Sequence, residues 1–215
     1  MKIFTKFSIL YLFFMGNILH GQCIYLAYDG FDYSPNQPLH ALSGSTGWQN
    51  PWEVQGSNTT IPGYQIHNGS LTFNTLQTVG NGATGGQAYL TAGRRFNTSA
   101  SGPFASYIQS GNEAIGTSNN GTLWVSFLIR KNQNNNESIF IDLHNNNIPW
   151  CSNCANHHIA AGYFGTPSNV SGQRRWTLRL NDQYYPGPVA ITVGQSYFIV
   201  MQIQFSATGT QVSMY

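Results

Sequence analysis

Charged side chains are scarce in this sequence of 215 residues, where aspartate, glutamate, lysine and arginine together make up 7%. Soluble domains usually carry about 25%. Nucleic-acid binding needs lysine and arginine to displace counterions from phosphates, and here basic residues occur singly or in short pairs such as Arg94-Arg95 and Arg174-Arg175. The composition therefore argues against a nucleic-acid partner. It also argues against disorder, because 41% of the residues are apolar and 14% are aromatic.

The sequence also lacks an apolar run of the length that a membrane span requires. The apolar run at residues 7–19 is shorter than the about 20 residues of a spanning helix, and Lys2 and Lys6 precede it. This pattern predicts an export signal over residues 1–21 and a mature chain over residues 22–215. We expect a secreted or cell-surface protein without a membrane span after cleavage. Removing two of the 9 basic side chains leaves 7 against 7 acidic ones, so the mature chain has no net charge.

Cysteine is limited to three positions, 23, 151 and 154, so at least one thiol has no partner within the chain. Cys151 and Cys154 form a Cys-x2-Cys motif that precedes His157 and His158. These are ligand types of a zinc site, but the spacing to the histidines is shorter than in zinc fingers. A third possibility is two free thiols. In an exported protein we expect a disulfide between Cys151 and Cys154.

Helical periodicity is nearly absent after the export signal, and period-2 alternation of apolar residues takes its place. The alternation predicts strands at residues 122–130, 138–143, 159–164, 175–180, 197–205 and 211–215. Clusters of Asn and Gly separate many of them, which indicates an all-β fold of the sandwich or barrel kind. The last two strands are predicted to form a hairpin. Because the sequence stops within an alternating strand, we expect it to be a fragment of a longer protein.

Several segments, in their order along the chain, carry a resemblance to a known family. They are Tyr28–Tyr33, Gly44–Trp52, Thr122–Arg130, Gly162–Gly165 and the hairpin that ends at Tyr215. Together they resemble the concanavalin A-like, LamG-type jelly-roll modules of large secreted proteins from Bacteroidetes, of the type IX secretion cargo type. The resemblance implies an all-β, two-sheet antiparallel jelly-roll β-sandwich over residues 22–215, truncated at its C-terminus. It further implies glycan binding or adhesion, and additional domains in the same polypeptide.

Carboxylate pairs of the kind used by glycosidases are missing from the predicted strands. Glycoside hydrolysis usually needs two carboxyl groups that flank the scissile bond. The nearest pattern is Asp142 with His144, two positions apart and hence on one face of a strand. No phosphate loop, hydrolase elbow or dinucleotide motif occurs. We therefore expect a binding module rather than an enzyme. A polysaccharide-degrading hydrolase or lyase, its accessory domain, and a structural spacer are the alternatives.

Aromatic side chains in polar loops are the strongest signal for a binding site, with Trp150 predicted in one loop and Tyr184 and Tyr185 in another. Sugar rings stack their C–H faces on flat aromatic rings, while Asn, Gln and Asp bond the hydroxyls. The candidate glycan-binding residues are Trp150, Tyr184, Tyr185, Asn146, Asp142 and His144. Packing beneath their own loops is the alternative for the aromatic members. The remaining tryptophans, at positions 48, 52, 124 and 176, are expected to fill the core or cover its edge.

A calcium site is a further hypothesis. Loops of sandwich modules often hold Ca²⁺ with carboxylate and carbonyl oxygens, and Asp29 and Asp32 lie close together around Gly30. Aspartate is equally common in turns, where its carboxylate bonds its own backbone. Asp29 and Asp32 are therefore either candidate Ca²⁺ ligands or turn residues.

Overall fold

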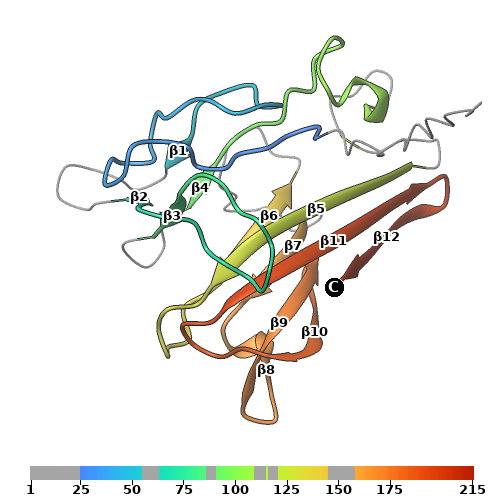
Figure 1. Ribbon diagram of the computed structural model, residues 1–215. Coiled ribbons are helices and arrows are strands. Elements are labelled where there is room, and N and C mark those ends of the chain that lie inside the picture. The colour runs from blue at the N-terminus through green and yellow to red at the C-terminus, as the bar shows by residue number, and fades with distance from the viewer. Residues whose placement is uncertain (1–24, 55–62, 86–90, 109–114, 116–120, 145–157) are drawn as a thin grey trace, which may run out of the picture.

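The fold is known from a computed structural model that describes residues 25–54, 63–85, 91–108, 115, 121–144 and 158–215. Within these residues the protein is all-β, as the sequence predicts, and its paired strands are antiparallel (Figure 1). The helices described are two 3-10 turns, at Ala105–Tyr107 and Thr166–Ser168. None of the described helices has the length and apolar character needed to cross a membrane.

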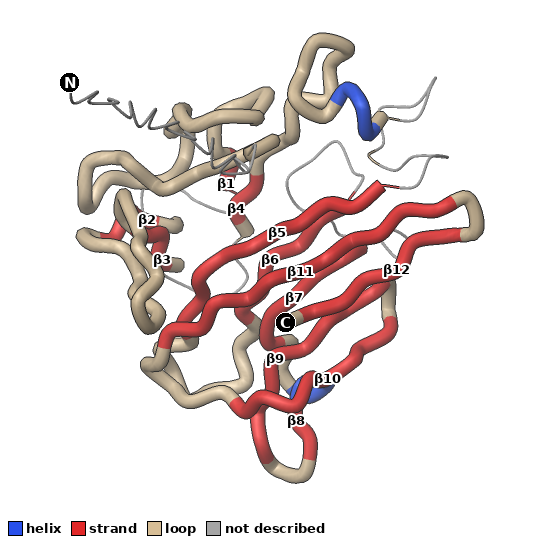
Figure 2. Tube along the Cα trace, turned by 45° about the vertical axis from the view of Figure 1, so that its right-hand side comes forward, coloured by secondary structure: helices blue, strands red, loops and turns tan. Residues whose placement is uncertain are grey.

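Two sheets form the C-terminal part of the molecule (Figures 1 and 2). We call β12-β11-β5 the front sheet and β10-β9-β7-β6 the back sheet, in which β8 also pairs with β9. The strands are β5 (Gly121–Arg130), β6 (Ile139–His144), β7 (His158–Tyr163), β8 (Asn169–Val170), β9 (Gln173–Leu180), β10 (Gln183–Ala190), β11 (Ser196–Ser206) and β12 (Gly209–Met214). Each of the six strands predicted above has its counterpart among them, and the terminal hairpin is confirmed.

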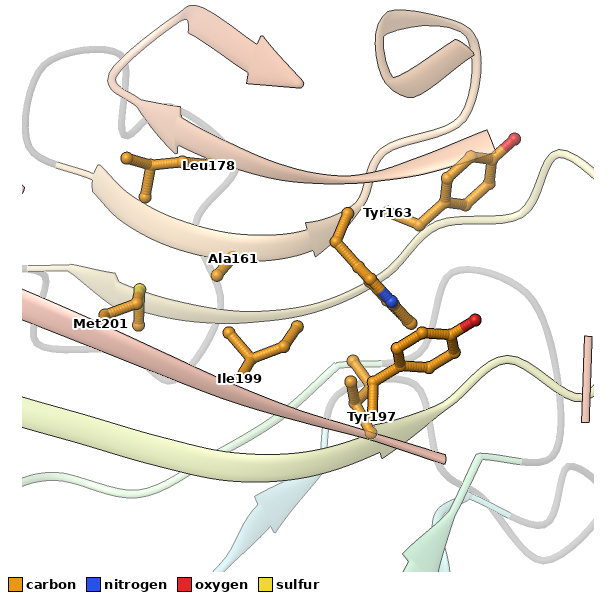
Figure 3. Packing of buried hydrophobic residues seen from close by; sticks show 8 residues of the cluster. Ala161, Tyr163, Leu178, Tyr197, Ile199 and Met201 are labelled. Carbon is orange, nitrogen blue, oxygen red and sulfur yellow. The ribbon is translucent and has the colours of Figure 1, made fainter. Parts of the chain in front are cut away.

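The two sheets share one apolar core, and this gives the region a β-sandwich-like arrangement (Figure 3). Side chains from β5 and β11 meet side chains from β7 and β9. The buried members are Ile129, Ala161, Tyr163, Trp176, Leu178, Tyr197, Ile199 and Met201. Burying one large apolar side chain contributes about 1.5–3 kcal/mol, so this cluster is the main source of stability in the sandwich.

Strict alternation along β11 sets which face of the front sheet is buried. Tyr197, Ile199, Met201 and Ile203 are buried, and the residues between them are half-buried or exposed. Met201 lies opposite Val125 on β5 and Met214 on β12, so these side chains point to the same face. A slip of one residue would turn every buried side chain to the outside, and the register is therefore fixed by the core.

Strand β10 was not expected, because its sequence contains Pro186, Gly187 and Pro188. Proline cannot donate a ladder hydrogen bond and is confined to edge strands and bulges. The structure satisfies both conditions, since β10 is the edge of the back sheet and its register shifts between Pro186 and Ala190. The prediction that Tyr184 and Tyr185 lie in a loop is therefore wrong, and both belong to this strand.

The described residues between positions 25 and 108 form a second region, which we call the N-terminal cap. Its strands are short and pair as β1 (Glu53–Val54) with β4 (Ala92–Gly93) and β2 (Gln65–His67) with β3 (Gly82–Thr84). Its own core holds Leu39, Val54 and Ile66. The cap touches the outer face of the front sheet through Phe73, whose ring centroid lies 6.3 Å from that of Phe198 on β11. The cap therefore covers that face around Phe198.

Candidate functional site

Four of the predicted site residues lie outside the described residues: Asn146, Trp150, Cys151 and Cys154. The glycan contacts of the first two and the disulfide between the last two stay predictions. Asp142, His144, Tyr184, Tyr185, Asp29 and Asp32 are placed by the structure, and they fall into three separate surroundings.

Asp142, His144 and Tyr184 share the outer face of the back sheet. Asp142 and His144 lie on β6, two positions apart as expected, and Asp142 pairs with Ala160 on β7. Ala160 in turn pairs with Arg179 on β9, which pairs with Tyr184 on β10. Side chains paired in this way point to one face of the sheet. The strand register thus brings these three predicted residues to one face of the back sheet, on which Ala160 between them is fully buried.

The ring of Tyr184 is nevertheless engaged in packing. Its centroid lies 5.5 Å from that of Phe164 in an edge-to-face arrangement, and the guanidinium carbon of Arg179 lies 5.6 Å from it. Tyr185 points to the opposite face, because it pairs with the core residue Leu178, yet it is 53% exposed at the sheet edge. Tyr184 and Tyr185 therefore do not form one binding surface.

Asp29 is the centre of a buried polar cluster in the cap. Its side chain is 5% exposed and that of its ion-pair partner Arg94 is 3% exposed, with Arg94 Nη1 2.7 Å from Asp29 Oδ2. The same oxygen accepts hydrogen bonds from Trp52 Nε1 at 2.8 Å and from the Tyr33 hydroxyl at 3.1 Å. The other oxygen accepts from the backbone N–H of Phe31 at 2.8 Å, which is the bond of an aspartate turn.

These contacts commit the Asp29 carboxylate to protein donors, with a guanidinium beside it. Burial, followed by the charge and hydrogen bond of Asp29, raises the pKa of Tyr33. Asp32 is exposed. Within the described part of the chain, no group of three or more His, Cys, Asp or Glu side chains is placed to hold a metal ion. Calcium binding at Asp29 and Asp32 stays a prediction, and the turn role is confirmed for Asp29.

The tryptophans differ in their surroundings. Trp176 lies in the core, 4% exposed, as expected. Trp48 and Trp52 are half-buried and flank Arg94, whose guanidinium carbon lies 5.1 Å and 5.7 Å from their ring centroids. Trp124 is 60% exposed, so the expectation that it fills or covers the core is wrong. It occupies an even position of β5, whereas the odd positions face the core.

Trp124 belongs to an aromatic surface on the outer face of the front sheet. It pairs with Gln202 on β11, and Gln202 pairs with Ser213 on β12. Tyr215 follows β12, is 68% exposed and exchanges backbone hydrogen bonds with Val200 at 2.9 and 3.1 Å. The ring centroids of Trp124 and Tyr215 lie 6.4 Å apart at an interplanar angle of 31°. The Tyr215 hydroxyl lies 3.4 Å from Gln202 Oε1, to which it donates.

Polar, uncharged side chains surround these two rings. They lie at the outward positions of the same three strands, where register places Thr122 opposite Gln204 and Gln204 opposite Gln211. We call the set the Trp124 platform, and its members are Thr122, Trp124, Gln202, Gln204, Gln211, Ser213 and Tyr215. The sequence held a signal for it: Trp124 is a lone large aromatic between Thr122 and Ser126 on the polar side of an alternating strand.

The side chains of the platform have the chemistry to bind a flat, hydroxyl-bearing ligand. Aromatic faces carry partial negative charge, which attracts the weakly positive C–H groups of a flat ligand. Each glutamine amide carries two N–H donors and one acceptor oxygen, and these can form hydrogen bonds with hydroxyl groups. The platform contains no carboxylate, whereas glycoside hydrolysis usually needs two. Comparisons of this chain with protein-family models, with curated proteins and with solved structures found no match.

Proposed function

We propose that this chain is a non-catalytic extracellular module that binds glycans, or mediates adhesion through them, as part of a larger secreted or cell-surface protein. The carrying observation is the pair of exposed rings, Trp124 and Tyr215, on either side of Gln202. Burying an aromatic ring is strongly favourable, so two rings left open beside an amide suit a ligand with apolar faces and hydroxyl edges. Sugars have both.

The fold and the predicted export signal support the same proposal. Two antiparallel sheets that pack in a sandwich-like way suit the concanavalin A-like jelly roll implied by the resemblance. Such a scaffold holds side chains on rigid strands, where binding geometry is better defined than on loops. The low charge of the chain suits hydroxyl-rich ligands, which are recognised by stacking and neutral hydrogen bonds.

Affinity electrophoresis of the purified protein through gels that contain plant, algal or animal polysaccharides tests this proposal. We expect retardation by at least one polysaccharide and its loss in Trp124→Ala. Tyr25→Ala is the matched control, because Tyr25 is 68% exposed but lies in the cap, away from the platform. If Trp124→Ala is still retarded and Tyr185→Ala is not, the protein binds glycans, but its binding site lies on the back sheet. No retardation by any polysaccharide would contradict the function.

A further inference from the structure

The front sheet carries no Asp, Glu, Lys, Arg or His side chain along most of its length. Residues 196–215 include no Asp, Glu, Lys, Arg or His, and residues 121–129 include none either. Its charged residue is Arg130, at the end of β5 remote from the platform and opposite Ser196. In the back sheet, by contrast, strand β9 alone carries three arginines, Arg174, Arg175 and Arg179.

Charged side chains in other parts of the sandwich already have hydrogen-bond or ion-pair partners there. Arg175 donates to the carbonyl oxygens of Gly187 and Pro188 at 3.2 and 2.8 Å, and Arg179 pairs with Asp182 at 3.2 Å. Lys131 is 4% exposed and donates to Asn135 Oδ1 and to the carbonyl oxygen of Glu137. None of these side chains belongs to the Trp124 platform, so the members of the platform themselves offer a ligand aromatic rings, amides and hydroxyls and no charged side chain.

From this we infer that the Trp124 platform takes an uncharged polysaccharide, bound along an internal stretch of its chain across the three strands. The inference rests on the proposed function and specifies its ligand. A uronate or sulfate group that contacts the platform would lose hydration without gaining a cation, which is costly. A neutral sugar has no charged group to dehydrate, and its hydroxyls can form hydrogen bonds with the glutamine amides.

Strand geometry sets how such a chain lies. Trp124 and Ser213 are on the two outer strands of the front sheet, with Gln202 between them. Neighbouring strands are roughly 4.8 Å apart, which is close to the length of one pyranose residue along a polysaccharide. The row from β5 to β12 therefore matches about two successive sugar units. Gln202, on the middle strand, lies beside Trp124 and within hydrogen-bond distance of the Tyr215 hydroxyl, so its amide can bond the hydroxyls of a sugar that stacks on either ring.

The experiment compares polysaccharides that share a backbone and differ in charge. Hydroxyethyl cellulose against carboxymethyl cellulose is one such pair, and neutral galactan against its sulfated form is another. We expect retardation by a neutral member, with the charged partner bound at least roughly tenfold more weakly. Binding should be unchanged in about 1 M NaCl, where the Debye length is about 3 Å. Trp124→Ala should weaken it about tenfold or more, as truncating a central aromatic contact does, while Tyr25→Ala leaves it unchanged.

A designed charge gives a second, positive test. Gln204 is exposed at the rim of the platform, and Gln204→Lys supplies the missing cation. This variant should gain salt-sensitive binding to the charged member of a pair while keeping its affinity for the neutral one within about twofold.

The outcomes separate this inference from the proposed function. Binding restricted to acidic polysaccharides, weakened by salt and indifferent to Trp124→Ala, would overturn the neutral-ligand inference and leave glycan binding standing. Concentration-dependent dimers in analytical ultracentrifugation, abolished by Trp124→Ala, would instead make the platform a self-association surface and also overturn it. Absence of binding to every polysaccharide of both kinds would overturn the two proposals together.

Discussion

The cap and the sandwich of this molecule are held together in different ways. The sandwich has strands of up to 11 residues and one shared core of apolar side chains. The described strands of the cap are two or three residues long, and its small core lies beside the ion pair of Asp29 and Arg94. The sandwich therefore depends on apolar burial spread along its strands, whereas the cap depends on one polar cluster that joins distant segments.

Tryptophan plays three different parts in the two regions. Trp176 fills the sandwich core, Trp48 and Trp52 stack on a guanidinium in the cap, and Trp124 stands in solvent on the front sheet. Only the third use contributes little to the fold. An aromatic side chain that stabilises neither region is the residue most readily assigned to a ligand.

The largest effect is expected from Trp176→Ala. Removing a buried tryptophan costs about 3–5 kcal/mol, and a domain of this size has a total stability of about 5–15 kcal/mol. Urea unfolding followed by circular dichroism should show the transition of the sandwich at a much lower midpoint. A midpoint shift equal to that of a surface variant would contradict the assignment of the sandwich core.

Arg94→Met should destabilise the cap while leaving the sandwich nearly intact. The change leaves the Asp29 carboxylate buried without its cation, which costs about 3–5 kcal/mol. Hydrogen exchange should therefore accelerate in residues 25–108 and stay slow in β7, β9 and β11. The double variant Asp29→Asn/Arg94→Met should recover part of the loss, because no buried charge is then left without a partner. Uniform acceleration in both regions would mean that the cap and the sandwich unfold as one unit.

Alkaline pH should act on the two regions in opposite directions. Burial raises the pKa of Tyr64 in the cap above its ordinary value of 10.0, so its stabilising contribution is present below pH 10 and is lost as pH rises through the folded-state pKa. Burial, then the charge of Arg174, lowers the pKa of Lys131 in the sandwich below 10.5. Between its folded-state pKa and 10.5, Lys131 is protonated less in the folded protein than in the unfolded chain. The free energy of unfolding therefore rises with pH in this range.

Hydrogen exchange followed between pH 9 and pH 11, with rates corrected for intrinsic exchange, checks this small effect. This range spans the ordinary pKa values of tyrosine, 10.0, and lysine, 10.5. Tyr64→Phe should flatten the decline in the cap, and Lys131→Met should flatten the rise in the sandwich. Identical pH profiles in the two regions would show that these groups do not titrate as their burial implies.

Much of the sandwich follows from local sequence pattern, because period-2 alternation reports which face of a strand is buried. The pattern located β5 and β11 closely. It failed at β10, where Pro186 and Pro188 suggest a loop and only the position at the sheet edge makes a strand tolerable. It also failed at Trp124, because hydrophobicity alone does not tell whether the second face of a strand is covered.

The cap and the candidate site depend on contacts that local pattern does not contain. Asp29 and Arg94 are 65 positions apart, and nothing in the sequence near either residue indicates its partner. Asp142 and His144 share a face as their spacing predicts, but their relation to Tyr184 depends on the strand order β10-β9-β7-β6. The Trp124 platform likewise arises from the register of three strands, two of which lie some 70 residues or more beyond the first.

The most direct test measures stability and binding on the same Trp124→Ala protein. Surface substitutions usually change stability by no more than about 0.5 kcal/mol, so the urea midpoint should match that of the unmodified protein. Retardation by a neutral polysaccharide should fall about tenfold or more. That pair of results would establish Trp124 as a ligand-binding residue. A large loss of stability, or binding that persists unchanged, would contradict the central claim that this tryptophan is held in solvent for a ligand.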